Sequence, residues 1–161
     1  MAAMSKADYV VRVGDREAPV SSAADLERHL ADVRSSEYSD FWVVQRGSAM
    51  KGFEQFVYRA LGLRSEADGP SVYVLTAPEG AAVVFLDEDF NEHRVVSSQH
   101  GRAGDVVFRL ANGQETRHSA DEVIDRSTAL DAVRYFVEHG ERPSSLNYRD
   151  ARGGRRRRAR N

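Results

Sequence analysis

The spacing of apolar residues changes along the chain, and these changes predict the order of helices and strands. The β-branched run YVVRV, residues 9–13, predicts a short strand, and GDREAP after it predicts a loop. In SSAADLERHLADVR, Leu26, Leu30 and Val33 repeat at the spacing of one helical face, and Ser22 precedes them as a candidate N-cap. This stretch is therefore predicted to form an amphipathic helix with one buried face.

Two apolar stretches follow the first helix. FWVVQ, residues 41–45, is short and rich in aromatic and β-branched residues, which favours a buried strand with Trp42 in the core. SAMKGFEQFVYRALG, residues 48–62, places Met50, Phe53 and Val57 on one helical face and predicts a second helix.

From Ser71 the pattern changes to short β-rich segments about ten residues apart. They are separated by turn sequences and read SVYVLTA, AAVVFLD, HRVVSS, DVVFRLA and ETRHSA. Asn112 and Gly113 separate the last two, and both residues tolerate the positive φ of a tight hairpin turn. The spacing predicts an antiparallel meander.

The segment DRSTALDAVRYFVEHGERP predicts the last helix. Its apolar residues repeat on one helical face, Ser127 or Thr128 can cap its start, and Gly140 stands where a left-handed C-terminal residue belongs. Pro143 prevents continuation, and SSLNY after it predicts one short final strand.

Together these elements predict a single α+β domain over residues 1–148, a size that suits one hydrophobic core. We expect an antiparallel β-sheet of about six or seven strands with a central meander, and two or three helices packed on it. Residues 149–161 are expected to form a disordered arginine-rich tail.

The net charge of -2 conceals two regions of opposite sign. From Arg149 onward there are seven arginines and one acid, whereas residues 1–148 hold sixteen basic and twenty-four acidic side chains. An acidic body repels a phosphate backbone, so nucleic acid is expected to bind, if at all, only through the tail.

The composition also restricts compartment and chemistry. The chain has no cysteine, which excludes disulfides and thiolate-ligated metals. It shows neither a signal peptide nor an apolar run long enough to span a membrane, so we expect a cytoplasmic protein without membrane contacts.

The sequence offers only weak matches to catalytic or metal-binding motifs. Ser48 and Lys51 have S-x-x-K spacing without the accompanying motifs, and the acidic stretch 87–92 lacks the glycine of a calcium loop. The five histidines show no metal-ligating spacing; they are His29, His93, His100, His118 and His139. We therefore predict no catalytic residue, no metal and no cofactor.

Acidic residues gather on the predicted turns. One group surrounds a single aromatic residue and another precedes the last helix; they are Asp87, Glu88, Asp89, Phe90, Glu92, Asp121 and Glu122. Such residues can simply solvate turns. Alternatively, a negative patch around an aromatic anchor can bind a basic partner surface rapidly and tightly, which makes these seven residues candidate partner contacts.

Residues 118–148, HSADEVIDRSTALDAVRYFVEHGERPSSLNY, resemble the C-terminal signature of Imm1-type immunity proteins from bacterial polymorphic toxin systems. The signature residues are Gly140, Pro143 and Tyr148, the last standing where family members commonly have tryptophan. The resemblance implies a non-catalytic cytoplasmic inhibitor that binds and neutralises a cognate toxin domain, often one acting on nucleic acid.

Two other classes of function stay open on the sequence alone. The arginine tail could make the protein nucleic-acid-associated, with strongly salt-dependent binding. A small-molecule enzyme would need a deep pocket with a convergent histidine, His118 or His93, and a carboxylate.

Overall fold

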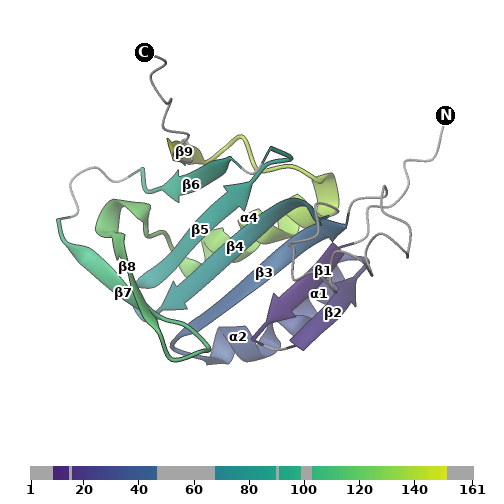
Figure 1. The fold of residues 1–161 in the computed structure, drawn as a ribbon, viewed down its shortest axis with the longest axis horizontal. Coiled ribbons are helices and arrows are strands. Elements are labelled where there is room, and N and C mark those ends of the chain that lie inside the picture. Colours follow the sequence, from purple (N-terminus) through teal and green to yellow (C-terminus); the bar gives the residue numbers. More distant parts are fainter. Residues whose placement is uncertain (1–8, 15, 47–67, 90, 99–102, 152–161) are drawn as a thin grey trace, which may run out of the picture.

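The computed structural model describes residues 9–14, 16–46, 68–89, 91–98 and 103–151, and its centre is an antiparallel sheet of seven strands. The strands are β1 (Tyr9–Val13), β2 (Arg16–Val20), β3 (Ser39–Arg46), β4 (Asp68–Ala77), β5 (Gly80–Leu86), β6 (Glu92–Val96) and β9 (Asn147–Ala151). Across the sheet they follow the order β2-β1-β3-β4-β5-β6-β9 (Figure 1). The predicted α+β class and strand number are confirmed.

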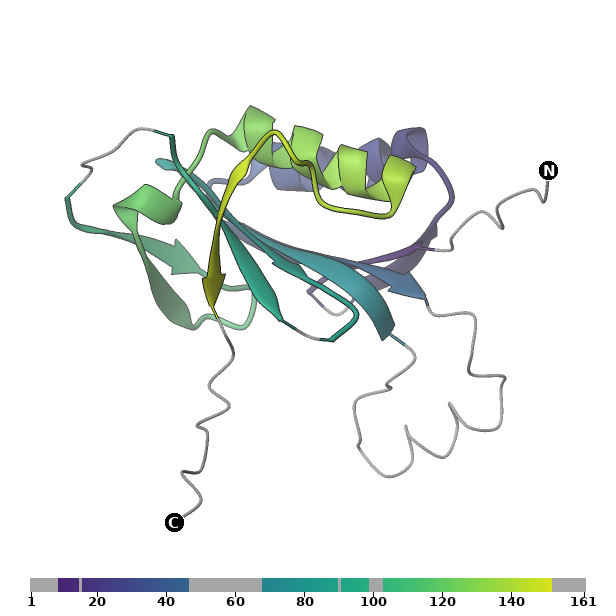
Figure 2. The ribbon, with the colours of Figure 1, turned by 90° about the horizontal axis from the view of Figure 1, so that it is seen from above.

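Helices cover one face of this sheet (Figure 2). They are α1 (Ala23–His29), α2 (Ala31–Ser35) and α4 (Arg126–His139). Alternate residues of the strands, such as Phe41 and Phe85, face the helices. They are buried against helix residues such as Val133 and Phe136 of α4. This main core covers one apolar face of the sheet, and the alternation of buried and exposed positions along the strands fixes their register.

A two-stranded hairpin covers part of the opposite face. It consists of β7 (Asp105–Arg109) and β8 (Glu115–Ser119) (Figure 2). Phe108 of β7 buries its ring against Leu75, Ala77 and Ala82. The predicted meander is therefore correct from β4 to β6 and wrong beyond it. The apolar side of the β7–β8 hairpin is buried against the sheet instead of extending its edge, and β6 pairs with β9.

Local turn and capping predictions are confirmed at three positions. Ser22 accepts a hydrogen bond from the Asp25 backbone N–H at 3.2 Å. Gly113 has φ 84° in the β7–β8 hairpin, and Gly140 ends α4 in the left-handed region with φ 77°. Each of these residues supplies a conformation or an acceptor that the local backbone requires.

Other predictions at the ends of elements are wrong. The N-cap of α4 is Asp125 and not Ser127 or Thr128. The expected single first helix is divided at Leu30 into α1 and α2. Residues predicted as a loop after β1 form β2, an edge strand in which mostly exposed side chains leave no apolar alternation.

Trp42 does not lie in the core. Its side chain is half-buried on the face away from the helices, where it stacks on Tyr73 with ring centroids 4.3 Å apart. The neighbouring Phe41 and Val43 point into the main core instead, because successive residues of a strand face opposite sides.

The link between β8 and α4 is fastened to the sheet by its backbone. It contains the short 3₁₀ helix η1 (Ala120–Glu122). The Ile124 and Ala81 backbones exchange hydrogen bonds of 2.9 and 2.8 Å, and the Ser97 N–H donates to the Asp121 carbonyl at 2.6 Å. These bonds hold η1 beside β6.

Arg126 fixes the start of α4 to the loops around it. Its guanidinium donates to main-chain carbonyl oxygens of Ser36, Glu37 and Ala77. Within the described ranges, no helix is long and apolar enough to cross a membrane.

Two expectations fall partly or wholly outside the described residues. The helix predicted over residues 48–62 lies outside them, as do residues 152–161 of the predicted tail. The first residues of that predicted tail, Arg149 and Asp150, instead belong to β9.

Candidate partner-binding surface

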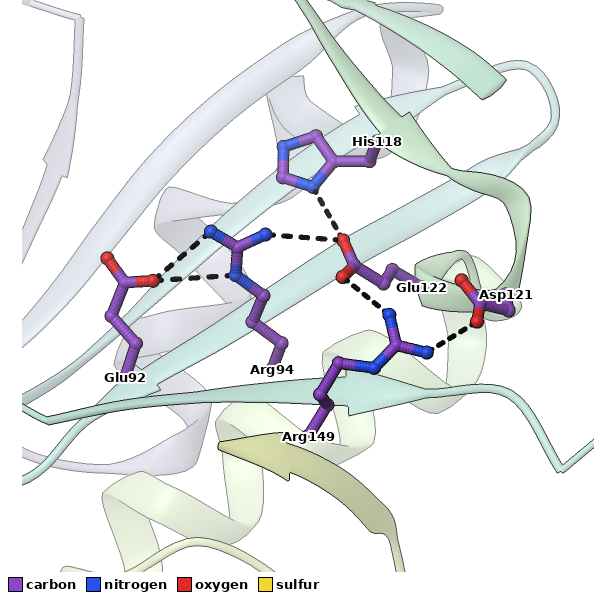
Figure 3. Close-up of polar contacts among 6 residues, drawn as sticks. All are labelled: Glu92, Arg94, His118, Asp121, Glu122 and Arg149. Carbon is purple, nitrogen blue, oxygen red and sulfur yellow. Dashed lines mark hydrogen bonds and ion pairs between the residues drawn. The ribbon is translucent and has the colours of Figure 1, made fainter. Parts of the chain in front are cut away.

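A network of charged side chains joins β6, β9 and η1 on the face of the sheet away from the helices (Figure 3). Glu122 is its centre, and we call it the Glu122 cluster; its members are Glu92, Arg94, His118, Asp121, Glu122 and Arg149. One Glu122 oxygen accepts a hydrogen bond from Arg149 at 3.2 Å, and the other lies 3.6 Å from a guanidinium nitrogen of Arg94. Only 8% of the Glu122 side chain is exposed.

The register of the sheet explains why these charges need one another. Arg94 of β6 stands directly opposite Arg149 of β9. Like charges in such a cross-strand pair are destabilising unless a counter-charge lies between them. Glu122 supplies that counter-charge, while Glu92 and Asp121 hold the outer sides of the two guanidinium groups at 3.2 and 2.5 Å.

His118 completes the cluster from β8. Its Nδ1 lies 3.3 Å from Glu122, and its ring packs edge-on against Phe108 with centroids 5.4 Å apart. The histidine therefore connects the charged cluster to the apolar side of the β7–β8 hairpin.

The turn between β5 and β6 is organised by Asp87. One carboxylate oxygen of Asp87 accepts backbone N–H bonds from Asp89 and Asn91, both at 2.9 Å. Partial burial acts to raise the pKa of Asp87, but hydrogen bonds from His93, Asn91 and Asp89 outweigh it and lower the pKa to about 2. Asp87 is thus an ionised residue that shapes the turn.

His93 connects this turn to the last strand. Its Nε2 lies 3.0 Å from Asp87 and its Nδ1 lies 2.6 Å from Asp150, which is opposite His93 in β9. The histidine is 8% exposed and both of its nitrogens face carboxylates. The β5–β6 turn and the end of β9 therefore hold a fixed relative position.

The candidate contacts named from the sequence divide into two groups. Glu88 and Asp89 are exposed on the turn, and among the described residues no side chain bonds to their carboxylates. Asp87, Glu92, Asp121 and Glu122 all have partners within the protein. Phe90 lies outside the described residues.

A pocket of about 500 Å³ opens beside the same turn, between β5, β9 and the end of α4. We call it the aromatic pocket, because its apolar lining includes Phe85, Phe136 and Tyr148. Three carboxylates and one arginine also line it, namely Asp87, Glu88, Glu141 and Arg142. The pocket thus combines an aromatic wall with a mainly negative rim.

The sequence model of the immunity protein family Imm1 matches this chain over residues 14–150. The chain belongs to the Imm1 family. A comparison with curated proteins gave no match. The matched range contains the whole Glu122 cluster, the β5–β6 turn and the aromatic pocket, so these features lie within the part of the chain that the Imm1 model describes.

The signature residues of this Imm1 chain form one structural unit. Gly140 ends α4, and the Tyr148 hydroxyl donates to the Pro143 carbonyl oxygen at 2.6 Å. Burial raises the pKa of Tyr148 to about 12, although nearby Arg142 acts to lower it, so the phenol keeps the proton that it donates. The loop from Gly140 to Tyr148 is thereby folded back so that β9 pairs with β6.

Sequence reasoning missed the basic partners of the acidic residues. In the sequence, Arg94 is one of several polar residues in a predicted strand, and nothing nearby marks it as a partner of an acid. Arg149 was assigned to the tail. The two arginines are 55 residues apart in the sequence. Only the pairing of β6 with β9 reveals that they face each other.

The remaining histidines make no metal site in the described parts of the chain. No group of three or more histidine, aspartate or glutamate side chains is placed to hold a metal ion there. His139 stacks on Tyr135 with centroids 4.0 Å apart, a contact internal to α4.

Proposed function

We propose that this chain is an immunity protein that binds a cognate toxin domain and neutralises it by covering a basic surface of that domain. Membership of the Imm1 family is the observation that carries the proposal. The excess of acidic over basic side chains in residues 1–148 supports it, because opposite charge accelerates association and favours the matching partner.

The β5–β6 turn is the part of the surface best suited to make the contact. Glu88 and Asp89 are exposed, and Asp87 and His93 hold the backbone beneath them. Backbone that is already held by hydrogen bonds, as at Asp89 and Asn91, loses little conformational entropy on binding. Phe90, next to these acids in the sequence, is the proposed aromatic anchor.

Two acids of the Glu122 cluster have a different role in this proposal. Asp121 and Glu122 neutralise the arginines of β6 and β9, so they shape the surface rather than meeting the toxin directly. Inhibition by covering a basic surface requires no catalytic group. A toxin that acts on nucleic acid is the proposed target class, because such an enzyme must present lysines and arginines to phosphates. The proposed place of action is the cytoplasm of the toxin-producing cell.

The proposal is tested with the toxin domain encoded beside this gene. Cells expressing that domain should survive only when this protein is co-expressed, and the two purified proteins should form a stoichiometric complex. The double charge reversal Glu88→Lys with Asp89→Lys should weaken the complex at least tenfold, mainly by slowing association and reducing its salt dependence.

The matched control reverses two exposed acids outside the turn. Glu79→Lys with Asp105→Lys makes the same change in net charge and should alter affinity less than threefold. Equal losses of affinity in both variants would show that net charge, and not a contact at the turn, determines binding. Absence of any complex or protection would refute the immunity function itself.

Binding of nucleic acid through the arginine tail is the second candidate, favoured by the six arginines in residues 152–161. Replacing these arginines with glutamine should then abolish binding to duplex DNA or RNA at low salt. Retained binding, with an unchanged salt dependence, would refute this candidate.

A further inference from the structure

The aromatic pocket has the chemistry of a site for a guanidinium group. Asp87 is engaged by His93 and the turn backbone, but Glu88 and Glu141 are exposed on the rim. Exposed carboxylates beside an aromatic wall attract a planar cation through both charge and ring contact.

Arg142 demonstrates that one wall of the pocket accepts such a group. Its guanidinium carbon lies over the Tyr148 ring, 5.0 Å from the centroid. Arg142 itself is exposed, so a second guanidinium can replace it at this ring without breaking a buried contact. The ring is held in place by its hydroxyl bond to Pro143 and by an edge contact with Phe85, with centroids 6.0 Å apart.

The chain carries a candidate occupant close to this pocket. Ala151, the last residue of β9, stands opposite Glu92 of β6, and Glu92 stands opposite Leu86 of β5, which lines the pocket. Neighbouring strands are about 4.8 Å apart, so Ala151 lies about 10 Å from the pocket wall. A ten-residue extended segment reaches at most about 33 Å, which is ample for the distance.

Charge makes that segment complementary to the rim. Residues 152–161 contain six arginines and no acid. Because the segment is covalently attached, its effective concentration at the pocket is on the order of millimolar, so even a weak site is occupied.

We propose that residues 152–161 dock in cis in the aromatic pocket, with an arginine held by Glu88 and Glu141 and stacked on Tyr148 in place of Arg142. The contact forms without any toxin, so it stands apart from the proposed immunity function. Salt weakens it, because the rim carboxylates are exposed to solvent.

A nitroxide label on the full-length chain tests this placement directly. The chain has no cysteine, so Asn161→Cys gives a single labelling site. At low ionic strength the label should broaden the NMR signals of Glu88, Glu141 and Tyr148 far more than those of α1 or the β7–β8 hairpin. One molar salt should remove the difference, since the screening length then falls to about 3 Å.

Two sets of variants of the labelled chain give opposite expected results. Glu88→Gln with Glu141→Gln should reduce the broadening at the pocket at least threefold, whereas Glu79→Gln with Asp105→Asn removes two exposed acids elsewhere and should leave it unchanged. Arg142→Ala should increase the broadening about twofold by freeing the ring. Arg109→Ala is its control, since Arg109 lies at the same 5.0 Å over the ring of Tyr38.

Three outcomes would overturn the proposal. Broadening spread evenly over the acidic surface would show a non-specific contact, and no broadening would show that the segment stays in solvent. The third outcome is docking between two molecules. Nitroxide-labelled chains are mixed with isotope-enriched chains that carry no nitroxide, and broadening of the signals of the latter would show it.

Discussion

Removing the Glu122 carboxylate should cost the protein a large share of its stability. Glu122→Ala takes the counter-charge from between Arg94 and Arg149, which lie 3.6 and 3.2 Å from it and face each other in register. Breaking a fully buried ion pair costs about 3–5 kcal/mol, and an exposed pair contributes about 0.2–1 kcal/mol. The two arginine side chains are 36% and 52% exposed and can partly recover hydration.

We therefore expect Glu122→Ala to lower the free energy of unfolding by about 2–3 kcal/mol, between these limits. For a chain of this size that corresponds to a fall in Tm of about 5–10 °C. Glu122→Gln keeps the shape and one acceptor oxygen, and it should cost about 1–2 kcal/mol. Urea is the suitable denaturant, because guanidinium chloride would screen the charges being measured.

Glu115→Gln is the matched control. Glu115 pairs with Arg109 at 3.3 Å, but both side chains are more than half exposed, so its loss should cost less than about 0.5 kcal/mol. Equal values for Glu122→Gln and Glu115→Gln at an unchanged m-value would refute the view that Glu122 holds β6 and β9 together.

Changes at other positions test further parts of the fold. Gly80→Ala should destabilise the protein by about 3 kcal/mol or more, because φ is 148° and an added Cβ would lie 2.4 Å from the Ile124 carbonyl oxygen. A Tm equal to that of the wild type in thermal unfolding would refute this close approach. Asp87→Ala should remove a stabilisation of about 1 kcal/mol, a value discounted for the exposure of the carboxylate. The wild type has this stabilisation above pH 4 and loses it as the pH falls towards 2. Urea titrations across that range should show a flatter pH dependence of the free energy of unfolding in the variant. Arg126→Ala should cost about 2–3 kcal/mol in urea unfolding, because three carbonyl oxygens lose a charged donor, and a loss below 0.5 kcal/mol would contradict that role.

Elements with strong local signals were predictable from the sequence. Helix α4 combines a long apolar repeat with a glycine at its end, and α1 begins at a serine whose side chain accepts the bond expected of an N-cap. In each case residues within a few positions of one another determine the conformation.

Features that depend on distant pairing were not predictable in the same way. The edge strand β2 carries mostly exposed residues, so no apolar alternation distinguishes it from a loop. Trp42 is apolar, yet it occupies the sheet face away from the helices, and its partner Tyr73 is 31 residues later in the chain. Residue type does not reveal which face of a strand receives the helices.

The candidate site shows the same division. The acidic turn was visible as a cluster in the sequence, and Glu88 and Asp89 are indeed exposed there. Glu122 looked like one more surface acid, but it is buried because β6 and β9 bring two arginines to it. Charge composition identifies acidic segments, whereas only tertiary pairing decides which carboxylates are already neutralised.

The two edges of the seven-stranded sheet bear on self-association. An open edge exposes unpaired backbone groups to which a second chain can add a strand. At one edge Pro19 of β2 has no N–H to offer such a strand, and at the other edge β9 carries the charged pair Arg149 and Asp150. Proline and charged residues on edge strands are two ways in which natural sheets resist edge-to-edge polymerisation. We therefore expect neither β2 nor β9 to pair with a second chain at high protein concentration.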